Sequence, residues 1–243
     1  MITPTVALIG VLLLFVLLDS IKPLFANLFI LIYFLFAYIN LEGSSSLAIF
    51  YAVGILLVIV FDVARSKFSV TSEPINKLGG LSLKGKLGSS IIGVGLGVMI
   101  FLGMRLLQGN TAGAIIGTPS LAISSPAFNV TTIMLLGIVE TRMFFLIFNI
   151  MKDNKELFLK MPLIGRFLSP FVLVLPIIAV SALFGLFHLS AYASNVSSVT
   201  FAVFVMAIWV ISYYLTKSDL PANISHALWN GVVSLSRALG IAI

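Results

Sequence analysis

Long apolar stretches separated by short polar breaks make up most of the chain. Each stretch is near the ~20 residues that a helix needs to cross the core of a lipid bilayer. The pattern therefore predicts an all-α, polytopic transmembrane bundle with about eight spans, organised as a single integral-membrane domain over residues 1–243. The stretches cover residues 2–18, 24–38, 47–61, 87–107, 130–151, 171–188, 199–215 and 222–243.

Two details of these stretches concern how the helices pack. The fourth stretch contains five glycines, and small residues let helix backbones approach closely in lipid. We therefore interpret these glycines as packing positions rather than as a phosphate-binding loop. The sixth stretch contains Pro176, which predicts a kink in that helix.

The composition supports a membrane protein and excludes other classes. Hydrophobic residues make up 60% of the chain and charged residues 9%, whereas soluble domains have about 45–50% and about 25%. The mean hydropathy of +1.19 agrees. The chain has no cysteine, which excludes disulfides, thiolate catalysis and cysteine-ligated metals. The net charge of +6 is better explained by loops facing anionic lipid than by a nucleic-acid partner, which we do not expect.

The basic residues also predict an orientation. Nine of the fourteen Lys and Arg residues lie in the loops after the third and fifth stretches, among them Lys77 and Lys155. Lys22 and Lys217 fall in loops on the same predicted side. Because loops rich in Lys and Arg stay in the cytoplasm, we expect both termini to lie outside, with the protein in the plasma membrane of the cell.

Few residues inside the apolar stretches are suited to chemistry. Glu140 lies deep in the fifth stretch, His188 ends the sixth, and His226 and Asn230 lie four residues apart in the eighth. The last two therefore share one face of a helix. An ionisable residue inside a transmembrane segment is a functional candidate by default. A carboxylate and a histidine can activate water, and a His–Asn pair can stabilise an oxyanion, so the set is suited to hydrolysis.

Arg142 follows Glu140 by two residues, and a buried ion pair between them would give Glu140 a purely structural role. Residues two apart point to nearly opposite faces of a helix, so the spacing argues against that pair. We expect Arg142 to reach a carbonyl, another carboxylate or the cytoplasmic interface instead.

Two motifs in the second half of the chain resemble those of a known family. Phe184-x-x-x-His188 and His226-x-x-x-Asn230 are similar to the second and third motifs of the CAAX-prenyl-protease and bacteriocin-processing family of intramembrane proteases, called CPBP or ABI. The phrase Pro-Ala-Asn-Ile-Ser-His-Ala-Leu-Trp-Asn is especially similar to the last motif. The family also has about eight spans.

The resemblance covers the chain from Glu140 onward and implies a catalytic core at about 130–243. Members of the family are glutamate-dependent endopeptidases. The resemblance therefore implies that Glu140 and His188 activate water, and that His226 and Asn230 form the oxyanion hole. The substrate would be a membrane-associated peptide or protein.

The first motif of the family, Glu-Glu-x-x-x-Arg, is altered in this chain. Thr141 stands at the second glutamate and Phe145 at the arginine. The alternative to a protease is therefore a catalytically silent member of the same fold, acting as a scaffold or a subunit of a membrane complex. A transporter or channel that uses Glu140 and the histidines as a proton or cation relay is a third hypothesis, although no inverted repeat supports it.

The sequence predicts no cofactor. Nothing in it indicates an organic cofactor, and it contains no His-Glu-x-x-His run. If a metal binds, we expect zinc at Glu140, His188 and His226, because asparagine is a poor zinc ligand.

Overall fold

The computed structural model describes residues 3–40, 45–68, 83–108, 125–154, 174–189 and 196–240. Within these ranges every regular element is a helix, which confirms the all-α fold class. Each of the eight helices overlaps one of the predicted apolar stretches. They are α1 (Pro4–Ile21), α2 (Pro23–Asn40), α3 (Ser45–Phe68), α4 (Leu83–Gln108), α5 (Pro126–Asp153), α8 (Leu175–Phe187), α9 (Val196–Thr216) and α10 (Leu220–Ala238).

Proline marks the start of several of these helices. In the first helical turn the missing N–H of proline costs nothing, since that donor has no partner in the helix. Pro4, Pro126, Pro176 and Pro221 lie in the first turns of α1, α5, α8 and α10. The predicted kink at Pro176 is therefore wrong, because this proline starts α8 instead of interrupting it.

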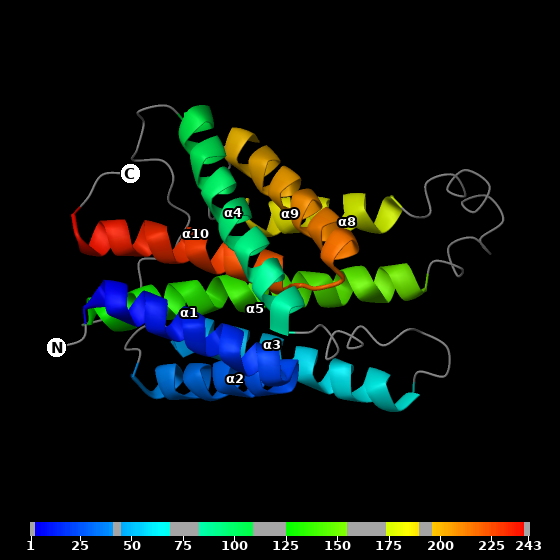
Figure 1. The fold of residues 1–243 in the computed structure, drawn as a ribbon, viewed down its shortest axis with the longest axis horizontal. Coiled ribbons are helices and arrows are strands. Elements are labelled where there is room, and N and C mark those ends of the chain that lie inside the picture. The colour runs from blue at the N-terminus through cyan, green and yellow to red at the C-terminus, as the bar shows by residue number, and fades with distance from the viewer. Residues whose placement is uncertain are drawn as a thin grey trace.

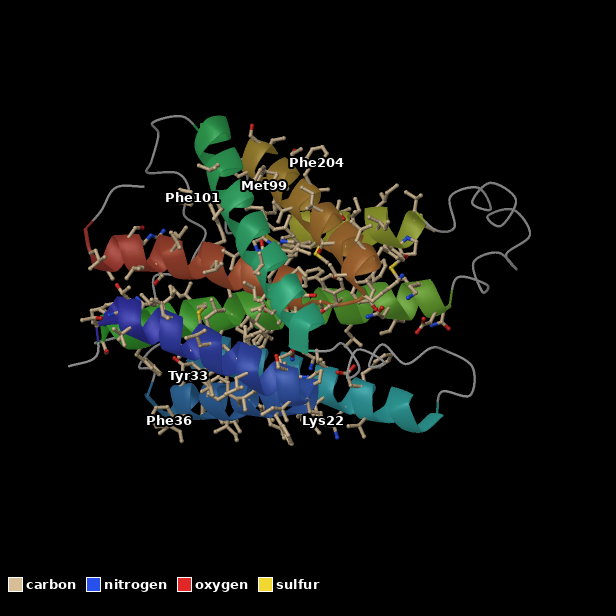
Figure 2. All side chains as sticks on the ribbon, viewed as in Figure 1. Lys22, Tyr33, Phe36, Met99, Phe101 and Phe204 are labelled. Atoms are coloured by element: carbon tan, nitrogen blue, oxygen red, sulfur yellow. The ribbon has the colours of Figure 1, made fainter. Side chains whose placement is uncertain are left out.

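The apolar surface of the helices identifies the chain as an integral membrane protein. Four of the described helical segments are long and apolar enough to cross a membrane: α1, α5, α9 and residues Gly85–Gly103 of α4. Shorter apolar segments lie in α2, α3 and α8. Large hydrophobic side chains such as Phe36, Met99 and Phe204 lie on the outside of the bundle (Figure 2). In a bilayer, lipid tails would contact such a surface.

The helices are arranged around a central pair, α5 and α10, which pack closely against each other (Figure 1). α1, α2 and α3 lie on one side of this pair, where they share an apolar core with α5 and α10. α4, α8 and α9 contribute to a second core on the other side, and α4 and α9 cross the central pair obliquely (Figure 1). Most side chains of α5 are buried, as expected for a helix with neighbours all round.

The contact between α4 and α10 depends on one of the glycines of the fourth stretch. A Cβ at Gly93 would lie 2.9 Å from Cβ of Ile224 and 2.9 Å from the carbonyl oxygen of Pro221. The packing interpretation therefore holds at Gly93. It does not hold at Gly88 and Gly95, where a Cβ would meet nothing within 4 Å.

The predicted orientation can be tested with residues that the structure describes, since Lys77 and Lys155 lie outside them. Lys22 joins α1 to α2 and Lys217 joins α9 to α10, and both are exposed. Their neighbours Pro23 and Ser218 line the same pocket, so both lysines lie at one end of the bundle. Thr3 caps the opposite end of α1, which is ~27 Å long.

We expect the single-cysteine variants Lys22→Cys and Lys217→Cys to resist a membrane-impermeant maleimide added to intact cells, whereas Thr3→Cys is labelled. The native chain has no cysteine, so the background is low. Labelling of Lys22→Cys and Lys217→Cys from opposite sides would contradict the arrangement of helices. Labelling of both from outside would reverse the orientation.

Candidate active site

Three helices bring Glu140, His188 and His226 together. Glu140 lies near the middle of α5, His188 directly follows α8, and His226 lies in the first half of α10. Oε2 of Glu140 is 3.6 Å from Nε2 of His188 and 3.5 Å from Nε2 of His226. One ligand atom from each of the three residues lies within 4.8 Å of the others. The predicted residues of the fifth, sixth and eighth stretches therefore meet at one point.

A fourth helix completes the surroundings of the carboxylate. Tyr51 of α3 donates a hydrogen bond from its hydroxyl to Oε1 of Glu140. Glu140 is only 8% exposed and Tyr51 is buried. The carboxylate thus has one oxygen held by a phenol and the other turned toward the two histidines. A buried carboxylate needs such partners, because an isolated one would be very costly to remove from water.

Aromatic rings enclose the two histidines. The ring of Phe184 lies 4.3 Å from that of His188 and 5.8 Å from that of His226, and the ring of Trp209 lies 4.8 Å from that of His226. Trp209 is itself fixed, because its Nε1 donates to Oγ of Ser225 at 3.0 Å. The motif residue Phe184 therefore contacts both histidines, which explains why the phenylalanine precedes His188 by one helical turn.

The hydrogen bonds of the histidines determine what each ring presents to Glu140. Nδ1 of His188 lies 2.8 Å from the carbonyl oxygen of Phe184. A carbonyl only accepts, so Nδ1 carries a hydrogen and Nε2 of the neutral ring is an acceptor. Nδ1 of His226 lies 3.0 Å from the hydroxyl of Thr141, a partner that can either donate or accept.

Asn230 lies one turn after His226, beside the same stretch of α5 and outside the three-residue cluster. Its Nδ2 donates to the carbonyl oxygen of Ile133 at 3.3 Å. A Cβ at Gly137 would lie 2.8 Å from Nδ2 of Asn230 and 3.1 Å from Cγ and Cδ2 of His226. His226 and Asn230 therefore share the face of α10 that packs on α5, and that contact requires a glycine.

Arg142 belongs to a separate polar centre. It donates hydrogen bonds to Asn27 and Asp19, and its Nε lies 3.7 Å from Oδ2 of Asp219. The prediction that Arg142 pairs with another carboxylate instead of Glu140 is confirmed. Lys86 donates to the carbonyl oxygens of Asp19 and Ser20 beside this group.

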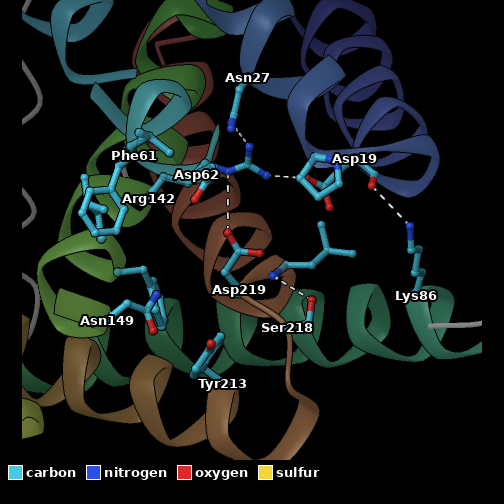
Figure 3. A pocket seen from close by; sticks show the side chains of 15 residues that line it. Asp19, Asn27, Phe61, Asp62, Lys86, Arg142, Asn149, Tyr213, Ser218 and Asp219 are labelled. Carbon is cyan, nitrogen blue, oxygen red and sulfur yellow. Dashed lines mark hydrogen bonds and ion pairs between the residues drawn. The ribbon is translucent and has the colours of Figure 1, made fainter. Parts of the chain in front are cut away.

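A pocket surrounds this second centre (Figure 3). It lies where the last turn of α1, the first turns of α2 and α10, and the later half of α5 meet. Side chains of α3, α4 and α9 also contribute to its wall. The pocket is lined by Asp19, Pro23, Asn27, Val58, Phe61, Asp62, Lys86, Arg142, Phe145, Leu146, Asn149, Tyr213, Ser218, Asp219 and Leu220. Glu140 is absent from this wall, so the pocket and the Glu140 cluster are distinct.

The residues at the two altered positions of the first motif both contact other side chains. Phe145, in place of the family's arginine, is buried, and its ring lies 5.3 Å from that of Tyr213 and 6.3 Å from that of Phe148. Thr141, in place of the second glutamate, contacts His226. The altered motif therefore provides an aromatic core contact at one position and a hydrogen bond to the candidate site at the other.

Comparison with known proteins gives one finding. Residues 145–232 match the family of type II CAAX prenyl endopeptidases described as Rce1-like. Over this segment the chain is similar to that family. The resemblance to the CAAX-prenyl-protease family is thereby confirmed, and the Rce1-like segment includes His188, His226 and Asn230. Glu140 lies five residues before it, so of the altered first motif the match includes only the last position, Phe145. No curated protein and no solved structure matches the chain significantly.

Sequence reasoning missed two residues that contact the candidate site, Tyr51 and Thr141. Tyr51 lies in an apolar stretch where an aromatic residue is more often part of the core, and no pattern distinguishes it. Thr141 carried a signal, since it is a polar residue next to Glu140 at an altered motif position. The sequence could not show that Thr141 contacts His226 on α10.

The glycine contact between α5 and α10 gives a stability prediction. Gly137→Ala should lower the free energy of unfolding by about 1–3 kcal/mol, because the new methyl group overpacks against His226 and Asn230. Gly95→Ala is the matched control: its Cβ meets nothing within 4 Å, and alanine is up to about 1 kcal/mol better than glycine in a helix. Unfolding of both variants in detergent measures the difference. Equal stability of the two would contradict the close contact.

Proposed function

We propose that the protein is an intramembrane endopeptidase that uses water as its nucleophile. The observation that carries the proposal is the convergence of Glu140, His188 and His226 on one point inside an otherwise apolar bundle. The Rce1-like match over two of these three residues supports the same chemistry. The substrate class that fits is a membrane-associated peptide, and a prenylated peptide ending in Cys-a-a-X is the first to test.

The arrangement suggests how water is activated. When the ring of His188 is neutral with its hydrogen on Nδ1, Nε2 of His188 and Oε2 of Glu140 are acceptors that lie 3.6 Å apart. A water between them would donate one hydrogen to each and direct its lone pair at a peptide carbonyl. Glu140 takes the proton as the water attacks, and then delivers it to the leaving amine.

The oxyanion of the tetrahedral intermediate needs hydrogen-bond donors. His226 and Asn230 lie one turn apart on α10, and both contact α5 next to Glu140. Nε2–H of His226 and the second hydrogen on Nδ2 of Asn230 are the donors that we assign to this role. Donors held in place before the reaction stabilise developing charge without reorganisation.

Metal-assisted hydrolysis is a second mechanism, and two of the distances among the three residues are compatible with it. Ligand atoms about 2.0–2.1 Å from a tetrahedral zinc lie ~3.3 Å apart. The distances of 3.5 and 3.6 Å from Oε2 of Glu140 to the two histidine nitrogens are close to that value. Zinc held by Glu140, His188 and His226 would polarise the water or the peptide carbonyl. Our proposal is the metal-free mechanism.

The second candidate function is a catalytically silent scaffold or subunit of a membrane complex. The observation that favours it is the first motif, where Thr141 and Phe145 replace a glutamate and an arginine. The buried carboxylate of Glu140 would then serve only to join α3, α5, α8 and α10. The two functions differ in whether the removal of Glu140 changes a reaction or only the stability.

We expect Glu140→Gln and His188→Ala to abolish cleavage of a prenylated peptide by the purified protein in detergent or nanodiscs. Asn230→Ala should lower kcat by about 10²–10³, the usual loss for one oxyanion donor. Asp153→Asn and Asn154→Ala are matched controls, because both residues are exposed at the end of α5. Full activity of Glu140→Gln would end the hydrolase proposal.

Metal dependence is tested separately. After treatment with a strong chelator, followed by its removal, the purified protein should retain its cleavage rate, since no step of the proposed mechanism needs a metal. Loss of the rate that is restored by zinc alone would replace the metal-free mechanism with the metal-assisted one.

A further inference from the structure

The phenol of Tyr51 holds the oxygen of Glu140 that the histidines do not face. Its hydroxyl donates to Oε1 of Glu140, whereas Oε2 lies 3.6 Å from Nε2 of His188 and 3.5 Å from Nε2 of His226. The terminal torsion of a glutamate side chain is broad and roughly two-fold, so rotation alone does not distinguish the two oxygens. The bond from Tyr51 distinguishes them, because it ties Oε1 to α3.

The position of Tyr51 follows from the packing of α3 on α5, two helices that run in the same direction (Figure 1). A Cβ at Gly54 would collide with Sδ of Met143, so the two helices approach closely there. Tyr51 precedes Gly54 by three residues, and Glu140 precedes Met143 by three. Residues three apart are neighbours on a helix surface. The same helix contact therefore places the phenol opposite the carboxylate.

Aromatic contacts fix the ring of Tyr51 itself. The ring of Phe34 stacks on it with centroids 5.7 Å apart and an interplanar angle of 23°, and the ring of Phe50 meets it edge-on at 5.3 Å. Tyr51 is only 4% exposed. The hydroxyl is therefore held in place by its packed ring, and Tyr51 can act through Glu140 without contacting a substrate.

No basic side chain in the described part of the chain shares this task. Arg142 pairs with Asp19, and Phe145 occupies the position of the arginine in the family's first motif. Among the described residues, no lysine or arginine pairs with Glu140. Apart from the two histidines, Tyr51 is therefore the described group that bonds to this carboxylate.

We propose that Tyr51 is a positioning residue, which holds Oε1 of Glu140 so that Oε2 stays directed at the two histidines. This inference rests on the proposed function, because Tyr51 maintains the orientation that Glu140 needs as a base. It gives α3 a role in the site, although α3 lies outside the segment matched to the family. The bond engages only Oε1, so it is compatible with the metal-free and with the metal-assisted mechanism.

The first test is the removal of the hydroxyl in Tyr51→Phe, which keeps the ring. The purified full-length protein in nanodiscs is assayed with a prenylated peptide. Tyr51→Phe should lower kcat roughly 10- to 100-fold, because a misplaced catalytic group can cost about 10²-fold in rate. KM should change little, since the phenol does not contact the substrate.

Tyr33→Phe is the matched control. The hydroxyl of Tyr33, on α2, lies 2.7 Å from Oγ1 of Thr132 and donates to the carbonyl oxygen of Phe128 at 3.3 Å, both in the first part of α5. Both variants thus lose a phenol bond to α5 and should become less stable, but only Tyr51→Phe should lose kcat. Retained kcat in Tyr51→Phe, or an equal loss in both variants, would overturn the positioning role.

A double-mutant cycle in detergent tests the hydrogen bond without a substrate. Glu140→Met removes the carboxylate and keeps an unbranched side chain. Tyr51→Phe should lower the folding equilibrium constant of the wild type roughly 10- to 150-fold more than that of Glu140→Met, the effect of one hydrogen bond to a charged group. Tyr33→Phe should lower both equally. Equal effects of Tyr51→Phe in the two backgrounds would overturn the inference.

The two readouts separate this inference from the proposed function. An active wild type whose cleavage rate survives Tyr51→Phe would contradict the positioning role and leave the proposed function supported. A wild type that shows the coupling between Tyr51 and Glu140 but cleaves no peptide would contradict the proposed function and the positioning role with it. The hydrogen bond itself would then stand as a contact that joins α3 to α5.

Discussion

The structure depends on one buried carboxylate in an apolar bundle. Glu140 lies in the middle of the central helix, where an unpartnered charge would be very unfavourable. Its partners come from three other helices: Tyr51 from α3, His188 from the end of α8, and His226 from α10. The need to satisfy this carboxylate therefore fixes where four helices meet. The same need places two imidazole rings beside a carboxylate, and the proposed hydrolysis rests on this arrangement.

The central helix carries a second polar centre that faces another way. Arg142 reaches Asp19 of α1, Asn27 of α2 and Asp219 at the start of α10. A buried arginine requires such partners for the same reason as Glu140. α10 contributes to both centres, with Asp219 at one and His226 at the other. The ion pair thus fixes the start of α10, and the close contact at Gly137 brings His226 next to Glu140 two turns later.

The sequence was sufficient for the described helices and for the three residues that converge, Glu140, His188 and His226, because both follow from local rules. Hydrophobic run length located the eight helices in the described part of the chain. Helical spacing showed that His226 and Asn230 share a face and that Glu140 and Arg142 do not. Depth and tilt are not local properties. Straight, upright helices would place Glu140, His188 and His226 at different depths, and only the packed bundle brings them together. Run length gives neither tilt nor rotation, since packing against neighbours sets both.

The contacts that Tyr51 and Thr141 make with the site could not be predicted for a related reason. A tyrosine in an apolar stretch and a threonine in a helix each have an ordinary structural role, and only the facing helix gives them another. The central proposal, that Glu140 activates water for peptide cleavage, is tested most directly by cleavage of a prenylated peptide in ¹⁸O-water. The account predicts one ¹⁸O atom in the new carboxyl group of the product formed by the wild type, and no labelled product with Glu140→Gln. Labelled product formed equally well by Glu140→Gln, or no cleavage by the wild type, would contradict it.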